Sequence, residues 1–425
     1  MTSPTPFECV ASLLFGLALI HCFSVGAFQR WALRFPDGSI GENFFHLMGE
    51  VEIVFGLWAG LLILFLTFRE GGAEAIHYID SLNFTEPLFV FVIMVMASTR
   101  PILTMARLGI ESLAKVLPLP WALRFYVAAL VLGPLAGSLI TEPAAMTVTA
   151  LVLKEQFFER GLSKKFLYAT LAVLFVNVSI GGTLTAYAAP PVLMVAGKWG
   201  WGSRFLFEHF GWKAILAVIA NAGGAAFYFR KQLAPLPESG KKREQKQAVP
   251  AWLMFAHVVF LAGVVVNSHH ERFFAGIFLF FLGFVTVTEE YQYELRLRDS
   301  LLVGFFLGGL VVLGGPQKWW LAALLPKFGE LGLFLSSTVL TGFVDNAALT
   351  YLGSQVPSLT DGLKYALLAG SVTGGGLTVI ANAPNPAGYT ILKSSFGEQG
   401  VSPVSLFLYA LIPTLVAAAA FWLLP

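Results

Sequence analysis

Charged residues are scarce in this sequence. Only 12% of the 425 residues are Asp, Glu, Lys or Arg and 56% are hydrophobic, whereas roughly a quarter of a soluble domain is charged. A soluble protein of this length would need far more charged side chains to cover its surface. The composition therefore excludes a water-soluble protein and predicts an all-α polytopic membrane protein in contact with membrane lipid. The formal net charge of +2 gives no reason to expect a nucleic acid partner.

Cysteine is also scarce, with only Cys9 and Cys22 in the chain. On one helix these two residues would lie about 20 Å apart, too far for a disulfide. The segment Met1–Pro6 has no basic region and Glu8 follows, unlike a cleaved signal peptide, so the first apolar segment is expected to be retained. The sequence has no zinc-protease, serine-hydrolase or phosphate-binding-loop motif, which predicts that the protein is not an enzyme.

Basic residues are concentrated in one polar segment near the middle of the chain. They are Arg230, Lys231, Lys241, Lys242, Arg243 and Lys246, and they outnumber Glu238 and Glu244. Because positive loops stay in the cytoplasm, we expect residues 230–250 to be a basic cytoplasmic linker. It would join an N-terminal half, residues 1–229, to a C-terminal half, residues 251–425. The expected location is the cell inner (plasma) membrane, crossed several times.

Apolar runs recur at lengths near the ~20 residues that cross a bilayer as a helix. The predicted spans are Phe7–Phe28, Phe44–Phe68, Leu88–Ser98, Leu123–Phe157, Phe166–Val195, Trp212–Phe229, Ala251–Val266, Phe273–Val287, Leu301–Leu313, Leu331–Leu352, Leu363–Leu392 and Leu406–Leu424. Four of these runs carry polar residues, Gly or Pro in their middle, and these four contain two motifs that each occur twice.

The first repeated motif places a carboxylate inside an apolar run. Thr141–Thr147 matches Val344–Thr350 through a shared Ala-Ala pair and a final Thr, and the match aligns Glu142 with Asp345. Duplicated, polar, Gly/Pro-interrupted apolar segments are typical of secondary transporters whose binding site lies between two inverted repeats.

The second repeated motif is a glycine turn followed by proline. Gly181–Thr185 matches Gly374–Thr378, with Pro191 and Pro384 downstream. Glycine permits backbone conformations that other residues resist, and proline removes a backbone donor. Non-helical backbone survives at membrane depth only when it is buried in protein or lines a watery cavity. We therefore expect a short unwound turn between two half-helices in each half, rather than close helix packing through small residues.

Both glycine motifs resemble known transporter signatures. Asn177–Thr185, followed by Ala189–Pro191, resembles the first-repeat signature of the divalent anion/sodium symporters, and Gly375–Asn385 resembles the matching stretch of arsenite permeases. Both families belong to the ion transporter superfamily, and within it the chain is identified as a member of the putative Na+/H+ antiporter family. The resemblance covers Leu123–Val195 and Leu331–Leu392. It implies two inverted repeats, each with a re-entrant hairpin and a discontinuous transmembrane helix, and elevator-type transport.

The resemblance also implies which residues bind the ions. In the symporters the hairpin tips carry Ser-Asn-Thr, whereas here the tips read Thr141-Glu142-Pro143 and Val344-Asp345-Asn346, with a carboxylate in place of the central amide. The cation- and proton-binding residues implied are Thr141, Glu142, Asp345, Asn346, Gly181, Thr183, Thr185, Gly375, Thr378 and Asn382. Dicarboxylate recognition does not carry over, because two acids would repel such a substrate.

The chemistry of a membrane carboxylate agrees with this implication. A charged carboxylate at mid-membrane costs ~2.5–3.5 kcal/mol or more and survives only when it is paired or faces water. Burial favours the protonated form of a carboxyl group, whereas Na+ prefers oxygen ligands, as other hard cations do. One carboxylate that binds either ion would give exchange by competition. The alternative for Glu142 is a structural salt bridge, for example with Arg124.

Other ionisable residues are interpreted as structural. Glu50 and Glu52 are expected to face an interface near the start of the second span. His21 is expected to be a buried histidine with satisfied hydrogen bonds rather than a proton relay. Arg100 and Arg124 are expected to be interfacial anchors, with an anion clamp as the alternative.

The sequence thus predicts a secondary active transporter that exchanges Na+, or a similar monovalent cation, for H+. The transported Na+ and H+ are the only small partners expected, with no cofactor, and the resemblance implies a homodimer. Two alternatives stay open, namely an ion-coupled anion or oxyanion transporter of the same fold and a scaffold or channel without alternating access. The choice among Na+, Li+ and K+ and the stoichiometry also stay open.

Overall fold

The computed structural model describes residues 4–237, 247–397 and 400–425, and every regular element in these ranges is a helix. Short 3-10 or π-helical turns are labelled η. The elements of the N-terminal half are α1 (Pro6–Ala32), α2 (Ile40–Met48), η1 (Val51–Ile53), α3 (Val54–Glu70), α4 (Gly72–Asp80), α5 (Thr85–Ala97), α6 (Arg100–Val116), α7 (Trp121–Ile140), α8 (Glu142–Leu153), η2 (Lys154–Phe158), α9 (Lys164–Gly181), η3 (Gly182–Leu184), α10 (Pro190–Trp199), α11 (Ser203–Leu206), η4 (Phe207–Gly211) and α12 (Trp212–Tyr228).

The linker begins with a short helix, α13 (Arg230–Leu233), and its Glu238, Lys241, Lys242, Arg243, Glu244 and Lys246 lie outside the described residues. The elements of the C-terminal half are α14 (Ala251–Val266), α15 (Glu271–Val287), η5 (Glu289–Tyr291), α16 (Leu297–Gly314), η6 (Gly315–Gln317), α17 (Lys318–Leu324), η7 (Leu325–Phe328), α18 (Gly329–Thr341), α19 (Asn346–Ser354), α20 (Asp361–Gly374), α21 (Asn385–Leu392), η8 (Lys393–Phe396) and α22 (Pro403–Leu423).

The helices have the lengths and composition of a multi-pass membrane protein. Among the described residues, seven helical segments are long and apolar enough to cross a bilayer. The number becomes eight if α4 and α5, which are bent by 65°, form one span. The outward faces of these segments carry large apolar side chains such as Leu13 and Phe68, which are 63% and 87% exposed. An apolar outer surface of this kind is what contact with lipid requires.

One predicted span is broken in the structure. Phe44–Phe68 was expected to be a single helix, but α2 ends at Met48 and α3 begins at Val54. Gly49 ends α2, and Glu50 adopts an extended conformation with φ −96° and ψ 120°. The apolar run hides this break because hydrophobicity alone does not distinguish one long helix from two helices joined by a corner.

Two other predicted spans are joined by helix. The sequence predicts no span between Leu301–Leu313 and Leu331–Leu352. In the structure this segment is helical, and a helical run of 45 residues extends from Leu297 to Thr341. Its Lys, Trp and Pro residues interrupt the apolar pattern without ending the helical turns. The amphipathic helix α6 was likewise not predicted, because its polar face removes it from a search for apolar runs.

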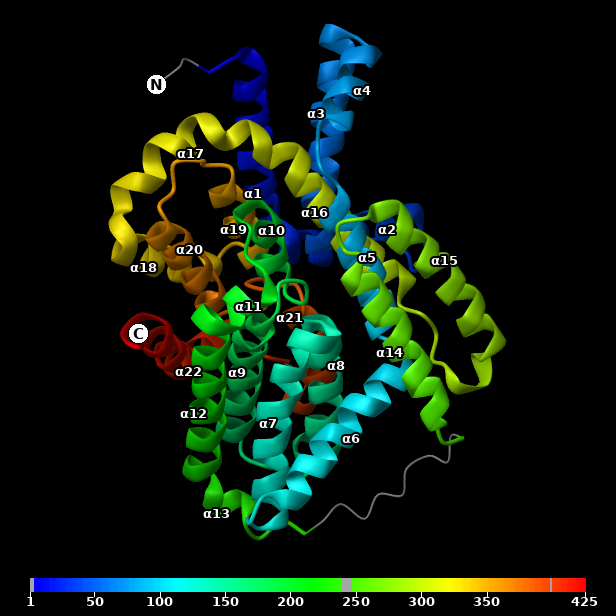
Figure 1. Ribbon diagram of the computed structural model, residues 1–425, viewed down its shortest axis with the longest axis vertical. Helices are drawn as coiled ribbons and strands as arrows, with labels where there is room; N and C mark the ends of the chain where they lie inside the picture. The colour runs from blue at the N-terminus through cyan, green and yellow to red at the C-terminus, as the bar shows by residue number, and fades with distance from the viewer. Residues whose placement is uncertain (1–3, 238–246, 398–399) are drawn as a thin grey trace.

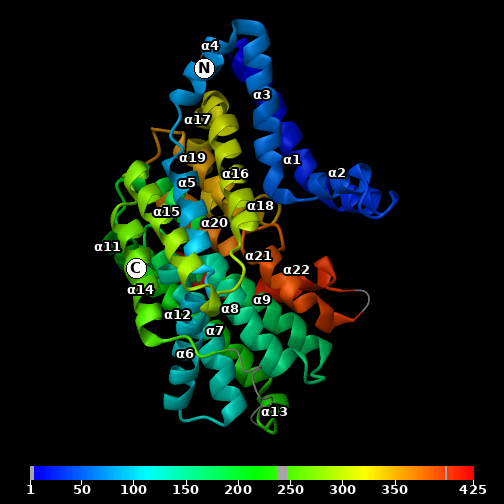
Figure 2. The same ribbon diagram turned by 90° about the vertical axis from the view of Figure 1, so that its right-hand side faces the viewer.

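The helices fall into two neighbouring groups (Figure 1). In the first, α7 packs against α6, α8, α9 and α12, and α22 of the C-terminal half packs against α9 and α12. In the second, α3 packs against α1 and α16, and α16 packs against α5. Figure 2 shows α1, α2 and α3 together at the end of the molecule away from α13.

The N-terminal and C-terminal halves pack against each other where the two helix groups meet. The helix α10 of the N-terminal half packs against α19 of the C-terminal half, and α21 of the C-terminal half packs against α8 of the N-terminal half. Each half therefore supplies one helix that covers the second helix of the other half's hairpin.

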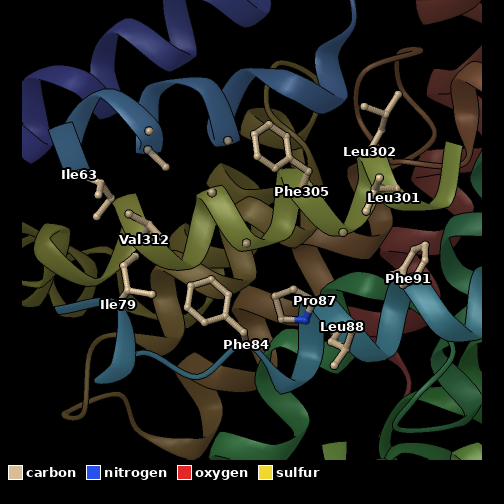
Figure 3. Close-up of a pocket in the computed structure, with 16 residues that line it drawn as sticks. Ile63, Ile79, Phe84, Pro87, Leu88, Phe91, Leu301, Leu302, Phe305 and Val312 are labelled. Atoms are coloured by element: carbon tan, nitrogen blue, oxygen red, sulfur yellow. The ribbon is translucent and has the colours of Figure 1, made fainter. Parts of the chain in front are cut away.

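Close backbone contact holds the second group together. A side chain at Gly309 of α16 would collide with the backbone of Gly56 of α3, so the two helices touch at these glycines. Beside this contact an apolar crevice of about 590 Å³ runs along α16 between α3 and α5. Figure 3 shows Phe305 directed toward α3, with Phe84 and Phe91 on the α5 side.

Candidate functional site

The predicted tip of the first hairpin is a single strained residue. α7 ends at Ile140 and α8 begins at Glu142, and the two helices pack along each other. Thr141 between them has φ 73° and ψ 151° and is the only non-glycine residue with positive φ in the described part of the chain. This conformation is almost restricted to glycine and costs of order 1–3 kcal/mol, and such strain concentrates at functional sites.

The tip in the second half is longer. α18 ends at Thr341 and α19 begins at Asn346, so that four residues, Gly342 to Asp345, form the connection. The Asp345 carboxylate caps α19 by accepting a hydrogen bond from the Ala347 backbone N–H at 2.8 Å. An aspartate at the N-cap satisfies a backbone donor that would otherwise lack a partner.

Both glycine turns interrupt their helices as the sequence predicts. α9 ends at Gly181, and regular α-helix resumes only at Pro190. α20 ends at Gly374, and α21 begins at Asn385. The intervening backbone is buried in protein for most of its length, which agrees with the rule that unwound backbone must be shielded from lipid.

Each hairpin tip is bound to the unwound stretch of its own half by matching hydrogen bonds. The Glu142 N–H donates to the Ala188 carbonyl at 3.4 Å, and the Asn346 N–H donates to the Ala381 carbonyl at 3.1 Å. A second matching pair lies four residues before each of these tip residues. There the Thr185 hydroxyl donates to the Ser138 carbonyl at 2.7 Å, and the Thr378 hydroxyl donates to the Gly342 carbonyl at 2.9 Å.

These contacts make Asn346 the counterpart of Glu142. The sequence match had instead aligned Glu142 with Asp345, one residue earlier. The close approaches of glycine agree with the contacts. A side chain at Gly182 would collide with the Glu142 carboxylate, and one at Gly375 would collide with Asn346. The sequence match was set by the Ala-Ala pairs, whereas the tip position is set by contacts with distant backbone. Glu142 and Asn346 therefore occupy equivalent places in the two halves. Asp345 precedes Asn346 as Thr141 precedes Glu142.

One hydrogen bond between the two halves ends on Glu142. The Asn382 side-chain amide, from the second unwound stretch, donates to Glu142 Oε2 at 3.0 Å, and both residues are buried. A second link joins the Asn346 amide to the Ser179 hydroxyl at 3.4 Å, and Ser179 donates to the Val372 carbonyl at 2.7 Å. Residues that the sequence assigned to different halves thus meet at one interface.

Several buried oxygens at this interface have no hydrogen-bond partner. They are Thr141 Oγ1, Glu142 Oε1, Asn346 Oδ1, Asn382 Oδ1 and Asn385 Oδ1. Each of these five residues is at most 2% exposed. Buried polar atoms without a partner are costly, and a hard cation satisfies such oxygens well. Oxygen atoms of this kind are the ligands that a hard cation prefers.

Asp345 is buried in the turn that precedes Asn346. It borders a small cavity with Cys22 of α1, Phe55 of α3 and Phe306 of α16. Its carboxylate is held by the α19 cap. The structure thus places the two predicted acids at neighbouring but different positions.

The remaining predicted residues shape the unwound stretches. The Gly181 carbonyl accepts a hydrogen bond from the Ser138 hydroxyl at 2.7 Å, and the Thr183 hydroxyl donates to the Ile180 carbonyl at 2.7 Å. In the second half the Gly375 carbonyl accepts from the Asn385 amide at 2.8 Å.

Sequence reasoning missed three of the residues at the site. Ser138 donates to Gly181 O and accepts from the Leu184 N–H at 2.9 Å, and Asn385 donates to the carbonyls of Gly375 and Thr378, each at 2.8 Å. Ser179, with the two bonds described above, is the third. Ser138 could have been found as a polar residue about one helical turn before Thr141. Ser179 and Asn385 could have been found because they lie within the two glycine motifs.

Three of the other ionisable residues, His21, Arg100 and Glu50, have defined partners. His21 is buried, with its ring nitrogens bound to the Met48 carbonyl at 2.9 Å and the Trp58 N–H at 3.2 Å, as expected for a satisfied histidine. Arg100 was expected to be an interfacial anchor but is only 8% exposed and donates to the Gln247 carbonyl at 2.6 Å. Glu50 pairs with Arg298 at 2.6 Å.

One protein-family model matches nearly the whole chain. The sequence model of the family described as "Putative Na+/H+ antiporter" matches residues 6–424. The match includes both hairpins and both unwound stretches. No curated protein matches the chain.

Proposed function

We propose that this chain, which belongs to the putative Na+/H+ antiporter family, exchanges Na+, or a similar monovalent cation, for H+ across the membrane. It is a multi-pass membrane protein of a transporter family rather than an enzyme family. The proposal includes insertion in the cell inner (plasma) membrane, because the basic residues around the linker favour a cytoplasmic position for it.

The observation that carries the proposal is the environment of Glu142. One carboxylate oxygen accepts the Asn382 amide, and the other is buried without a partner beside further unpartnered oxygens. A buried charge without a partner is costly, so the carboxylate needs either a proton or a cation. Both ions satisfy the same atom, so they compete for it.

The exchange then follows from this competition. With a proton on Glu142, the site is neutral and releases the cation, and with a cation among the oxygens of Thr141, Glu142 and Asn382 the proton is displaced. In the proposal Asp345 is a second proton- or cation-binding carboxyl, because it is buried and directly precedes Asn346. Asn346 contributes its side-chain oxygen, and the carbonyls and hydroxyls of the two unwound stretches, at Gly181, Thr183, Thr185, Gly375 and Thr378, complete the oxygen set.

We further propose that the two halves are inverted repeats and that transport uses an elevator-type movement. The matched tip contacts and the exchange of α10 and α21 between the halves support the repeat relationship. In this arrangement the hairpins and unwound helices move as one unit against α3, α5 and α16. A homodimer, formed through elements outside the moving unit, belongs to the same proposal and rests on family resemblance.

Transport in proteoliposomes with an internal pH dye tests the function. We expect an inward Na+ gradient to raise internal pH, with Li+ and K+ compared under the same conditions. Carboxylate and oxyanion gradients test the alternative of an anion transporter. Proton movement that depends on an anion and ignores monovalent cations would reject the antiporter proposal.

A further inference from the structure

A polar cavity of about 520 Å³, distinct from the apolar crevice along α16, lies next to the candidate site. One wall belongs to the elements that carry the site, with Pro143 and Thr147 of α8 and Pro384 and Ala387 near the start of α21. The opposite wall comes from Glu50 and Glu52, from Ser98, and from Arg296, Arg298 and Asp299 at the start of α16. The cavity therefore separates the two helix groups directly beside the first hairpin.

The cavity lies on the linker side of the protein. Arg100, next to the cavity residue Ser98, donates to the carbonyl of Gln247, and the Gln247 amide donates to the Tyr291 hydroxyl at 3.1 Å. Tyr291 begins the short segment that leads to Arg296. Gln247, near the end of the linker, is thus bound to two residues that are close in sequence to the cavity residues Ser98 and Arg296.

The charges on the second wall are not equivalent. Arg298 is neutralised by its ion pair with Glu50. Arg296 instead crosses the cavity, where its guanidinium donates to the Thr147 hydroxyl of α8 at 3.4 Å. A positive charge therefore lies against the helix that begins with Glu142, in a cavity whose second wall also carries the acids Glu52 and Asp299.

We propose that this cavity is the route by which the cation reaches Glu142 from the linker side, and that Arg296 is a positioning residue that limits cation affinity there. A positive charge in a confined polar path raises the energy of a second cation. Its hydrogen bond to Thr147 also ties α16 to the hairpin, so the bond must break when the cavity changes shape. This inference rests on the proposed function, but its first test does not require transport.

The first test is thiol accessibility in a chain whose two cysteines, Cys9 and Cys22, are replaced by Ser. In that background Ala387→Cys should react with a charged, membrane-impermeant thiol reagent added from the linker side. Ser203→Cys is the matched control, because it lies at the other end of the span Ser203–Tyr228 from the linker. It should react only from the opposite side. Labelling of Ala387→Cys only from the side of Ser203, or only after unfolding, would overturn the route.

The second test measures the Na+ dependence of exchange with cation added on the linker side. Arg296→Gln should lower the KM for Na+ by roughly threefold, because the repulsive charge is removed. Arg296→Lys keeps the charge and should retain the parent KM. Arg204→Gln removes an arginine whose side chain is 90% exposed and serves as the control. A structural defect does not tighten Na+ binding, so an unchanged or raised KM in Arg296→Gln would reject the role of Arg296.

The two tests separate this inference from the proposed function. If the parent protein shows no cation-dependent proton movement, the proposed function fails, whatever the labelling shows. If exchange occurs but Ala387→Cys is not labelled from the linker side, only the route fails.

Discussion

Asn382 and Glu142 are 240 positions apart in the sequence, and they share a hydrogen bond of 3.0 Å in the buried interface between the two halves. The amide donates to Oε2, so Oε1 of the same carboxylate stays available to a cation or a proton. A hydrogen bond to one oxygen thus orients the group that is proposed to do the chemistry, and each part of this arrangement can be tested.

The first prediction concerns the two carboxylates. Glu142→Gln and Asp345→Asn keep the size of each side chain but remove the proton that it can release. Each variant should lose pH-dependent Na+/H+ exchange, measured with the internal pH dye, while its yield and elution profile in detergent stay close to those of the parent. His21→Gln, outside the site, should retain exchange. Parent-like exchange rates in both amide variants would make these acids structural.

The second prediction concerns the partner of Glu142. Asn382→Ala removes both the donor to Oε2 and an unpartnered oxygen, and a hydrogen bond to a charged group contributes about 1.5–3 kcal/mol. We expect the KM for Na+ to rise by about tenfold or more, since each 1.4 kcal/mol is about a factor of ten. In Glu142→Gln the same change should have little further effect on cation binding, because residues in direct contact are not additive. Additive losses would show that the two residues act separately.

The third prediction concerns glycines at close approaches. Gly182→Ala should reduce both thermal stability and exchange, because the added methyl group collides with the Glu142 carboxylate. Gly375→Ala should do the same through Asn346 and Ser179. The matched control is Gly276→Ala in α15, where an added methyl group has no neighbour within 4 Å. There the higher helix propensity of Ala should stabilise the protein by up to about 1 kcal/mol. Thermal unfolding in detergent distinguishes these outcomes.

The fourth prediction separates stability from function at Thr141. Its φ of 73° is unfavourable for threonine, and glycine adopts this conformation without strain. Thr141→Gly should therefore raise the unfolding temperature. The same change removes the unpartnered Oγ1 and should weaken Na+ binding. A variant that is less stable, or one that binds Na+ as well as the parent, would contradict the role given to this residue.

The interruptions of the helices could be predicted from sequence because their causes are local. Gly181, Gly182 and Gly374–Gly376 are each followed by proline, and both halves repeat this pattern. Glycine pairs without it stay helical, as Gly223–Gly224 do in α12 and Gly308–Gly309 do in α16. The break at Glu50 could not be predicted, since nothing in the neighbouring apolar residues distinguishes a corner from a continuous helix.

Several residues of the candidate site could be predicted from the sequence, but the residue of the second tip that corresponds to Glu142 could not. The repeated motif indicated Glu142 and the family resemblance implied Asn382, and the structure brings these two residues into contact. The sequence match aligned Glu142 with Asp345 because the Ala-Ala pairs match, whereas the hydrogen bond to Ala381 places Asn346 there. Contacts between residues far apart in the sequence decide such a shift, and a single chain does not display them.

The exchange of α10 and α21 between the halves has a consequence for biosynthesis. Ribosomes complete the N-terminal half first, and at that stage α8 lacks the helix that covers it, because α21 has not been made. Glu142 likewise lacks its hydrogen-bond donor until Asn382 has been synthesised. The candidate site is therefore complete only after the second unwound stretch and α21 have been made, and until then Glu142 has no amide to orient its carboxylate.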